Sequence, residues 1–192
     1  PNLWNVGLLI GEIFGENTTV DDVHISGSID ISASDESWSS FSAVGGVFGT
    51  ASCQAQITNS TADIEMLFTG DLDSGDNVGG FAGLSTCEGS GASFNNIHVT
   101  GTILDSTGNV DRIGGVVGSM YGGDISGSSF TGTAENGPSI SGDDRIGGVV
   151  GYALGDFIIT NSHASGDISG DLYVGGFAGF IADGIIQNSY TT

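Results

Sequence analysis

The sequence predicts an all-β protein, a parallel β-solenoid of about six coils. Two observations lead to this fold class. A glycine-rich motif of the form V/I-G-G-Φ-Φ-G, in which Φ is apolar, occurs six times at intervals of 28 to 38 residues. A second motif follows each copy, and its apolar and polar residues alternate. Repeats of roughly 20–50 residues are typical of solenoids and related arrays, in which each repeat packs on its neighbours.

The glycine motif defines the repeats, which we number one to six. Its copies begin at Val6, Val44, Val78, Ile113, Ile146 and Val174. The first copy carries Leu8 in place of the second glycine. The interval falls to 28 residues at the last step, whereas a propeller blade takes about 40–45 residues and four strands. A coil of two or three short strands fits the shorter interval, so the solenoid is favoured.

The second motif has the form I-x-N-S-x-Φ-x-G-x-Φ and predicts a strand with one buried face. Its copies begin at Val20, Ile57, Phe94, Ile125, Ile159 and Ile186. Over residues 97–103, apolar and polar residues alternate strictly, as they do in a half-buried strand. The copy at Ile57 reads as interrupted by an insertion before Thr69.

The third position of the second motif predicts a ladder of polar side chains at a bend. Its occupants are Asp22, Asn59, Asn96, Gly127, Asn161 and Asn188. Stacked asparagines can form hydrogen bonds from one coil to the next, about 4.8 Å away.

Charge and hydropathy limit the partners. The chain has 23 acidic residues, two arginines and no lysine, for a net charge of −21. Nucleic acids and anionic membranes are bound through basic residues, so neither is expected as a partner. No apolar run reaches the length of a transmembrane helix, so no membrane insertion is expected. Because the repeats run from end to end, residues 1–192 are predicted to form one solenoid domain, a segment of a longer protein.

The two cysteines occupy equivalent positions in adjacent repeats. Cys53 and Cys87 each lie nine residues after the start of a glycine motif. Equivalent atoms of adjacent coils are about 4.8 Å apart, within the range of about 4.4–6.8 Å that a disulfide requires between Cα atoms. We therefore predict a disulfide formed in an oxidising compartment, with two stacked reduced cysteines as the alternative.

The outward residues of the second motif predict a flat strip of hydroxyl and histidine side chains. It comprises His24, Ser26, Ser28, Thr69, His98, Thr100, Thr102, Ser129, Thr131, Thr133, His163 and Ser165. We interpret it as the outer face of the coil, with a sugar- or partner-binding face as one alternative. An ice-binding face is the other, although Asp71 and Asp167 interrupt the array. The histidines fall in alternate repeats, about 9.6 Å apart, too far to share a metal.

Three further features have both a structural and a functional interpretation. Arg112 and Arg145 each follow an aspartate, which predicts a surface ion-pair cluster or, alternatively, a carboxylate- or sugar-binding site. Asp71, Asp73 and Asp76 are interpreted as part of the general acidity of the chain, with a calcium site as the alternative, although the terminal glutamate of an EF-hand is missing. The triplets at Asn17 and Asn59 fit N-glycosylation. Asn59 belongs to the polar ladder, which leaves Asn17 as the acceptor.

The paired motifs resemble the GLUG-motif repeats of large bacterial and archaeal surface proteins, including adhesin-like proteins. The resemblance covers all six repeats. It implies a non-enzymatic extracellular scaffold or adhesive region and brings no catalytic residues or cofactor. The open ends of a solenoid predict neighbouring solenoid copies or domains as partners. A surface glycan or another cell-surface protein is a further expected partner.

The alternative from another class is a glycan-processing β-helix enzyme. Acidic pairs such as Asp21/Asp22 and Asp143/Asp144 would supply its carboxylates, although a shared fold proves no function.

Overall fold

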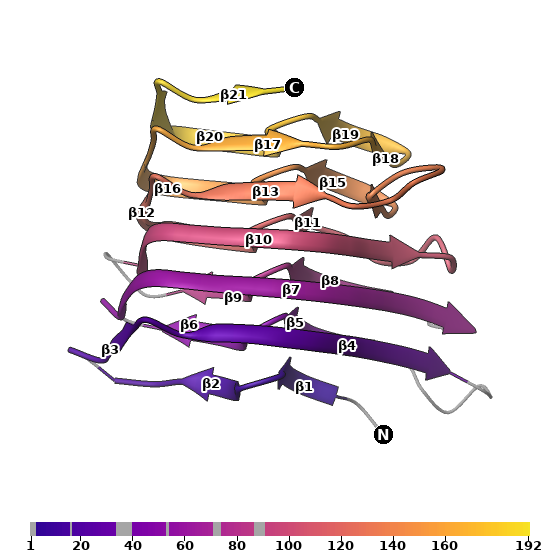
Figure 1. Ribbon diagram of the computed structural model, residues 1–192, viewed down its shortest axis with the longest axis horizontal. Coiled ribbons are helices and arrows are strands. Elements are labelled where there is room, and N and C mark those ends of the chain that lie inside the picture. The colour runs from indigo at the N-terminus through magenta and orange to yellow at the C-terminus, as the bar shows by residue number, and fades with distance from the viewer. Residues whose placement is uncertain (1–2, 16, 34–39, 53, 71–73, 87–90) are drawn as a thin grey trace.

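The computed structural model describes residues 3–15, 17–33, 40–52, 54–70, 74–86 and 91–192. Within these ranges it contains strands and turns but no helix, and the strands pair in parallel between successive repeats (Figure 1). The chain is a β-solenoid, which confirms the predicted fold class. None of the described segments is a helix of the length and hydrophobicity needed to cross a membrane.

The strands form three ladders along the solenoid axis. The first arm of the glycine motif supplies β1 (Leu3–Gly7), β5 (Ser40–Gly45), β8 (Ser74–Gly79), β11 (Ile113–Gly114), β15 (Asp144–Gly147) and β19 (Leu172–Gly175). The second arm supplies β2 (Ile10–Ile13), β6 (Phe48–Ser52), β9 (Ala82–Thr86), β12 (Val117–Ser126), β16 (Val150–Thr160) and β20 (Ala178–Gln187).

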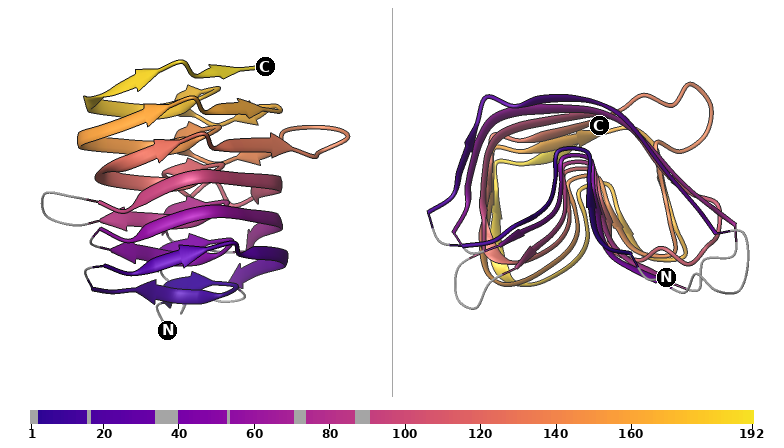
Figure 2. Two further views of the ribbon diagram at one scale, coloured as in Figure 1. Left: turned by 60° about the vertical axis from the view of Figure 1, so that its left-hand side comes forward. Right: turned by 90° about the horizontal axis from the view of Figure 1, so that it is seen from below.

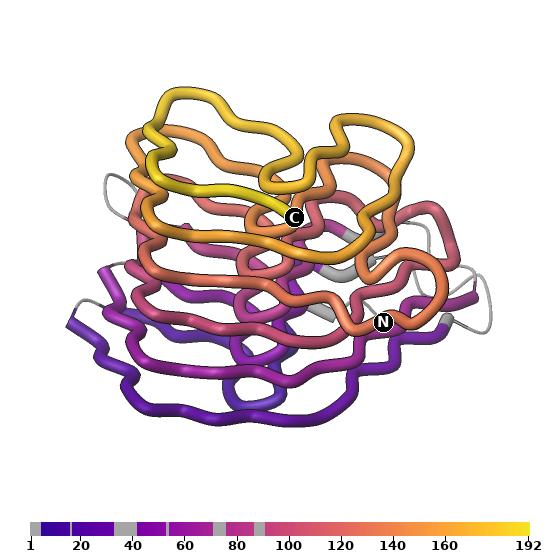
Figure 3. Tube along the Cα trace, turned by 45° about the horizontal axis from the view of Figure 1, so that its top comes forward, coloured from indigo at the N-terminus to yellow at the C-terminus, as the bar shows by residue number. Residues whose placement is uncertain are grey.

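The third ladder is formed by the second motif and makes the broad back of the solenoid, here called the long-strand face. Its strands are β3 (Thr19–Asp21), β4 (His24–Ala33), β7 (Gln56–Gly70), β10 (Ser93–Asp105), β13 (Ser129–Gly132), β14 (Ile140–Ser141), β17 (His163–Ser165), β18 (Ile168–Ser169) and β21 (Tyr190–Thr191). Figure 3 shows the successive turns following one another along the stack, and in Figure 1 strands β1 and β21 lie at its opposite ends.

The prediction of about six coils is slightly too high. Each of the six glycine motifs adds a strand to one six-stranded parallel sheet, but the solenoid makes about four full turns. The two outermost repeats have a neighbour on one side only. In repeat six the last strand, β21, has two residues, against thirteen in β10.

Each turn is re-entrant, because the glycine motif folds inward between two lobes of the cross-section (Figure 2, right). A Cβ atom at Gly79 would overlap the carbonyl oxygen of Ala82 on the opposite arm. A Cβ at Gly80 would lie 2.7 Å from Cγ1 of Val99 on the long strand. The first glycine thus lets the two arms meet, and the second lets the tip of the bend reach the long strand. The first glycine is thus a close-packing requirement in all six repeats, and the second glycine is one in repeats two to five.

The core fills the two lobes with apolar side chains from all three ladders. Phe48, Phe81 and Phe94 are buried, and their rings pack edge to face with centroids 5.5 and 6.4 Å apart. Burial of such large apolar side chains stabilises each by about 1.5–3 kcal/mol relative to exposure. The alternating residues of the second motif point into this core, as predicted.

The corner before the long strand carries the predicted polar ladder. All six occupants of the third motif position have positive φ angles between 50° and 58°, a conformation that Asn, Asp and Gly adopt most readily. The Nδ2 atom of Asn96 donates to Oδ1 of Asn59 at 3.0 Å, which confirms one predicted link between coils.

A second, buried ladder of serines adjoins this corner and was not predicted. The backbone N–H of Ile97 donates to Oγ of Ser128 in the next repeat at 3.1 Å, and Ser128 Oγ donates to the carbonyl oxygen of Ser126. The same two hydrogen bonds recur at Ser60, Ser162 and Ser189. Each serine thus satisfies a backbone donor at the bend, where the strand ladder is interrupted.

Candidate functional site

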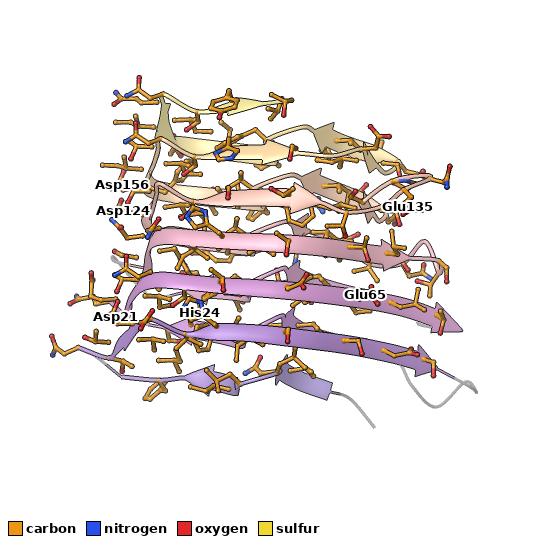
Figure 4. All side chains as sticks on the ribbon, viewed as in Figure 1. Asp21, His24, Glu65, Asp124, Glu135 and Asp156 are labelled. Atoms are coloured by element: carbon orange, nitrogen blue, oxygen red, sulfur yellow. The ribbon has the colours of Figure 1, made fainter. Side chains whose placement is uncertain are left out.

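The candidate functional site is the predicted strip on the long-strand face. Its side chains point outward from β4, β7 and β10 and from the shorter strands that follow, as the side-chain view of this face shows (Figure 4). Backbone pairing aligns Thr100 with Thr131 and Thr131 with Ser165. The structure therefore brings the predicted residues of repeats three to five together in one column.

The prediction for repeat two was wrong. Strand β7 runs without interruption over 15 residues, and no insertion is present. Asp63, and not Thr69, pairs with Ser26 and Thr100, and Glu65 pairs with Ser28 and Thr102. Thr69 pairs with Ser32, further along the same face. The cause is the buried Ile64, which occupies the place where the neighbouring repeats have the glycine of the motif.

This correction gives the strip an acidic middle. Asp63 and Glu65 are exposed, and they line a hollow of about 300 Å³ together with Ser26 and Ser28. The hydroxyl of Thr100 donates to Oδ1 of Asp63 at 2.9 Å. A regular hydroxyl array, as an ice-binding face would need, is therefore broken in repeat two as well as at Asp167.

Two histidines of the strip bridge adjacent repeats. His24 Nδ1 lies 2.8 Å from Oγ1 of Thr61 in the next repeat, and its Nε2 lies 3.1 Å from Oδ1 of Asp22. His98 makes the equivalent contacts, at 2.8 Å with Ser129 Oγ and at 2.9 Å with Asn96 Oδ1. Each ring therefore ties the polar ladder of its own repeat to a hydroxyl of the following one.

The third histidine follows the same column with a different contact. The His163 ring stacks on the Tyr190 ring, with centroids 5.1 Å apart and planes 5° from parallel. In the described part of the chain, no three His, Cys, Asp or Glu side chains are grouped closely enough to hold a metal ion.

Asp22, His24 and Thr61 have the atom types of a hydroxyl–imidazole–carboxylate triad, which sequence reasoning missed because the hydroxyl comes from another repeat. Acyl transfer also needs backbone donors for the oxyanion. The N–H of Thr61 is instead donated to the carbonyl oxygen of Val23. The His24 and Asp22 side chains are 62% and 79% exposed. The geometry supports a link between repeats better than it supports a nucleophile.

The predicted ion-pair cluster around the two arginines is confirmed. Arg112 Nη1 lies 3.2 Å from Asp76 Oδ1, and Arg145 Nη1 lies 3.5 Å from carboxylate oxygens of both Asp111 and Asp144. Burial, followed by repulsion from Asp144, raises the pKa of Asp111 above its usual value.

Aromatic rings complete this cluster, and the sequence did not reveal them. The guanidinium carbon of Arg112 lies 5.8 Å from the centre of the Tyr152 ring, and that of Arg145 lies 5.8 Å from the Tyr173 ring. Tyr152 stacks on Phe180 with centroids 5.2 Å apart. Cation–π contacts of this kind contribute about 0.5–2 kcal/mol each. Both cations are thus engaged by carboxylates and by rings of the chain itself.

Several predictions fall on residues outside the described ranges. Cys53, Cys87, Asp71 and Asp73 are among them, so the disulfide and the calcium site stay predictions. The residues that precede the cysteines, Ser52 and Thr86, pair in register. Asp76, the third predicted calcium ligand, pairs with Arg112. Asn17, the predicted glycosylation acceptor, is exposed.

Comparison with known proteins identifies one segment of the chain. Residues 142–169 match the family model described as the GLUG motif. No curated protein and no solved structure matches the chain. The matched segment contains the glycine motif and the second motif of repeat five, and the other five repeats stack on it in register. Residues 142–169 therefore carry a GLUG motif, which is consistent with a GLUG-motif repeat region.

Proposed function

We propose that the chain is a non-enzymatic structural or adhesive repeat domain of an extracellular surface protein. The GLUG motif and the β-solenoid support a repeat domain. The resemblance to GLUG-motif repeats of large surface proteins supports the extracellular and adhesive parts of the proposal. The net charge of −21 fits an exposed, soluble surface.

The observation that carries the proposal is the continuous pairing of the repeats. Each of the six glycine motifs adds a strand to one parallel sheet, and the long strands β4, β7 and β10 pair with one another in register. One buried apolar core runs along the whole stack. This organisation suits a structural repeat domain.

The end strands of a solenoid present unpaired backbone N–H and C=O groups, which favour pairing with another strand. We propose further solenoid repeats or covering domains as the partners there. Continuous pairing suits a structural role, because every turn is hydrogen-bonded to the next.

Two measurements test the proposal. Antibody labelling of intact source cells is expected to detect the domain at the surface, while an intracellular control protein stays unlabelled. The purified domain, incubated with soluble and insoluble polysaccharides, is expected to release no reducing ends. Turnover that disappears in Asp21→Asn/Asp22→Asn or in Asp143→Asn/Asp144→Asn would assign the chain to glycan processing instead. Labelling only after permeabilisation would contradict the surface location.

A further inference from the structure

A groove runs along the solenoid at the corner before the long-strand face. It consists of a hollow of about 440 Å³ that reaches from Asn17 in repeat one to Asp156 in repeat five. A second hollow of about 470 Å³ extends to Ile185 in repeat six. Both are lined by Asp124 and Asp156, which lie at one edge of the molecule in Figure 4. We call the continuous feature the corner groove.

Two glycines that border the corner groove are closely packed. The strand register shifts between Tyr121 and Gly123 and again between Leu154 and Phe157. Gly123 has a φ of 85°, and a Cβ atom there would overlap the carbonyl oxygen of Ala92. At Gly184, a Cβ would overlap the ring of Phe157.

The two halves of the corner groove differ in chemistry. One outward column of register partners runs through both: Thr19, Gln56, Ser93, Asp124, Ile158 and Ile185. Its first half offers uncharged amides and hydroxyls. Its second half offers two isoleucine side chains, Ile158 at 45% exposed and Ile185 at 47% exposed, which are neighbours across the ladder.

Carboxylates line the apolar half. Asp124, Asp156 and Asp183 all border the second hollow, and all three are exposed. Both arginines of the chain are paired with their own aspartates in another column. The apolar half of the groove therefore has a negative rim with no compensating charge from the chain.

We propose that the corner groove binds an extended peptide segment of a partner protein in which basic and apolar side chains alternate. Apolar side chains cover Ile158 and Ile185, and lysine or arginine side chains reach the aspartate rim. The amides and hydroxyls of the first half pair with the peptide backbone. Charge complementarity selects this occupant, since an exposed aliphatic floor beside carboxylates suits a cationic, apolar ligand and repels anionic polymers.

The volumes fit such a segment, because ligand sites commonly enclose about 300–1,000 Å³. An extended strand has side chains of alternate residues on one side, so apolar and basic residues in alternation can address the floor and the rim separately. The inference stands apart from the surface location and the adhesive role proposed above, since it concerns another face and a different property.

The test uses a fluorescein-labelled peptide, acetyl-Lys-Val-Lys-Val-Lys-Val-amide, and measures anisotropy at two salt concentrations. Two peptides serve as ligand controls, one with Glu in place of Lys and one with Gly in place of Val. We expect the Lys-Val peptide to bind at least about tenfold more tightly than either control and to weaken with salt.

Matched variants locate the binding. Asp124→Asn/Asp156→Asn and Ile158→Ser/Ile185→Ser are each expected to lower the affinity at least about fivefold. Asp63→Asn/Glu65→Gln removes the same charge from the long-strand face and is expected to have no effect. Leu67→Ser, at a side chain that is 40% exposed on that face, is the apolar control. Thermal unfolding of each variant verifies that it folds.

Three results would overturn the inference. Equal affinity for all three peptides would show that no groove of this chemistry exists. Equal weakening by the Asp63/Glu65 variant would show a general attraction of the acidic protein for cations. Displacement of the peptide by a neutral oligosaccharide, with loss of oligosaccharide binding in the Asp124/Asp156 variant, would make the groove a glycan site.

Discussion

The side chain of Leu8 lies over Gly27, so that a Cβ atom at Gly27 would be only 3.0 Å from Cδ1 of Leu8. Repeat two has the reverse arrangement. Its bend carries Gly46, and its long strand carries Ile64, the register partner of Gly27. A Cβ at Gly46 would lie 2.9 Å from Cγ2 of Ile64. In both repeats a large residue therefore meets a glycine. The large residue is at the bend in repeat one and on the long strand in repeat two.

This exchange predicts a compensating pair of substitutions. Gly27→Ile alone is expected to destabilise the protein by about 1 kcal/mol, the lower end of the range for an overpacked contact, because the Leu8 side chain is 38% exposed and can shift. Adding Leu8→Gly recreates the arrangement of repeat two and is expected to restore much of the loss. Denaturant unfolding of both single variants and the double variant gives the coupling free energy, which should be about 0.5–3 kcal/mol. Additive effects would show that the two residues do not share a contact.

The buried serine ladder predicts an unusually large cost for a small substitution. Ser128→Ala leaves the backbone N–H of Ile97 without its acceptor, and the expected destabilisation is about 1–3 kcal/mol. Hydrogen exchange of the Ile97 amide is expected to accelerate. Ser26→Ala, at an exposed position of the long-strand face, is the matched control and should change stability by less than about 0.5 kcal/mol. A loss no larger than that of the control would contradict a structural role for the ladder.

Asp143 lies near the carboxylates of Asp144, Asp171 and Asp105. Asp143→Asn is therefore predicted to raise the free energy of unfolding by an amount that depends on pH. Burial, followed by repulsion from Asp144, raises the pKa of Asp143 above its usual value of 3.8. A raised pKa means that the folded state binds the proton more tightly than the unfolded state. The carboxyl therefore contributes stability below pH 3.8 that is lost as the pH rises through the folded-state pKa.

Asp143→Asn removes this dependence, so its stability relative to the natural chain should increase across that window and stay higher at pH 7. Denaturant unfolding between pH 3 and pH 7 measures the difference. Asp21→Asn is the control of opposite sign, since hydrogen bonds from Thr58 and Asn59 lower the pKa of Asp21. A gain in unfolding free energy for Asp143→Asn that is independent of pH would contradict the raised pKa of Asp143.

The disulfide between Cys53 and Cys87 remains a prediction from the sequence. In the chain-entropy model, closing a loop of about 35 residues stabilises a protein by about 3–4 kcal/mol. Mass analysis of a non-reduced digest is expected to show the two cysteine peptides joined, and the digest needs a protease other than trypsin because the chain has no lysine. Recovery of both thiols free, from protein never exposed to reductant, would refute the bond.

The sequence was sufficient for the fold class, the repeats and the polar corner ladder, because each leaves a periodic signal. It was insufficient where the signal depends on a partner in another repeat. A serine such as Ser128 reads as a polar turn residue, although it is buried and accepts a hydrogen bond from the repeat before. Tyr152 and Phe180 are register partners on the second arm, and the Tyr152 ring contacts Arg112 only because the two arms fold together.

The register of repeat two could not be predicted from the motif. Its long strand carries Ile64 where the neighbouring repeats have the motif glycine. Buried and exposed residues alternate strictly from Ala62 to Phe68, so burial, and not the motif, determines which residues of β7 face outward. Asp63 and Glu65 were consequently missed as members of the face.

Cysteine cross-linking tests the stacked, in-register solenoid most directly. In a Cys53→Ser/Cys87→Ser background, Asp63→Cys/Thr100→Cys is expected to form a disulfide readily under mild oxidation, because these positions pair across adjacent strands about 4.8 Å apart. Thr69→Cys/Thr100→Cys is the matched comparison, with its positions displaced by six residues along β7 from the paired one. We expect a cross-link in the first variant and none in the second. A cross-link in the Thr69/Thr100 variant, with none in the Asp63/Thr100 variant, would contradict the register on which the solenoid, its acidic face and its repeat contacts depend.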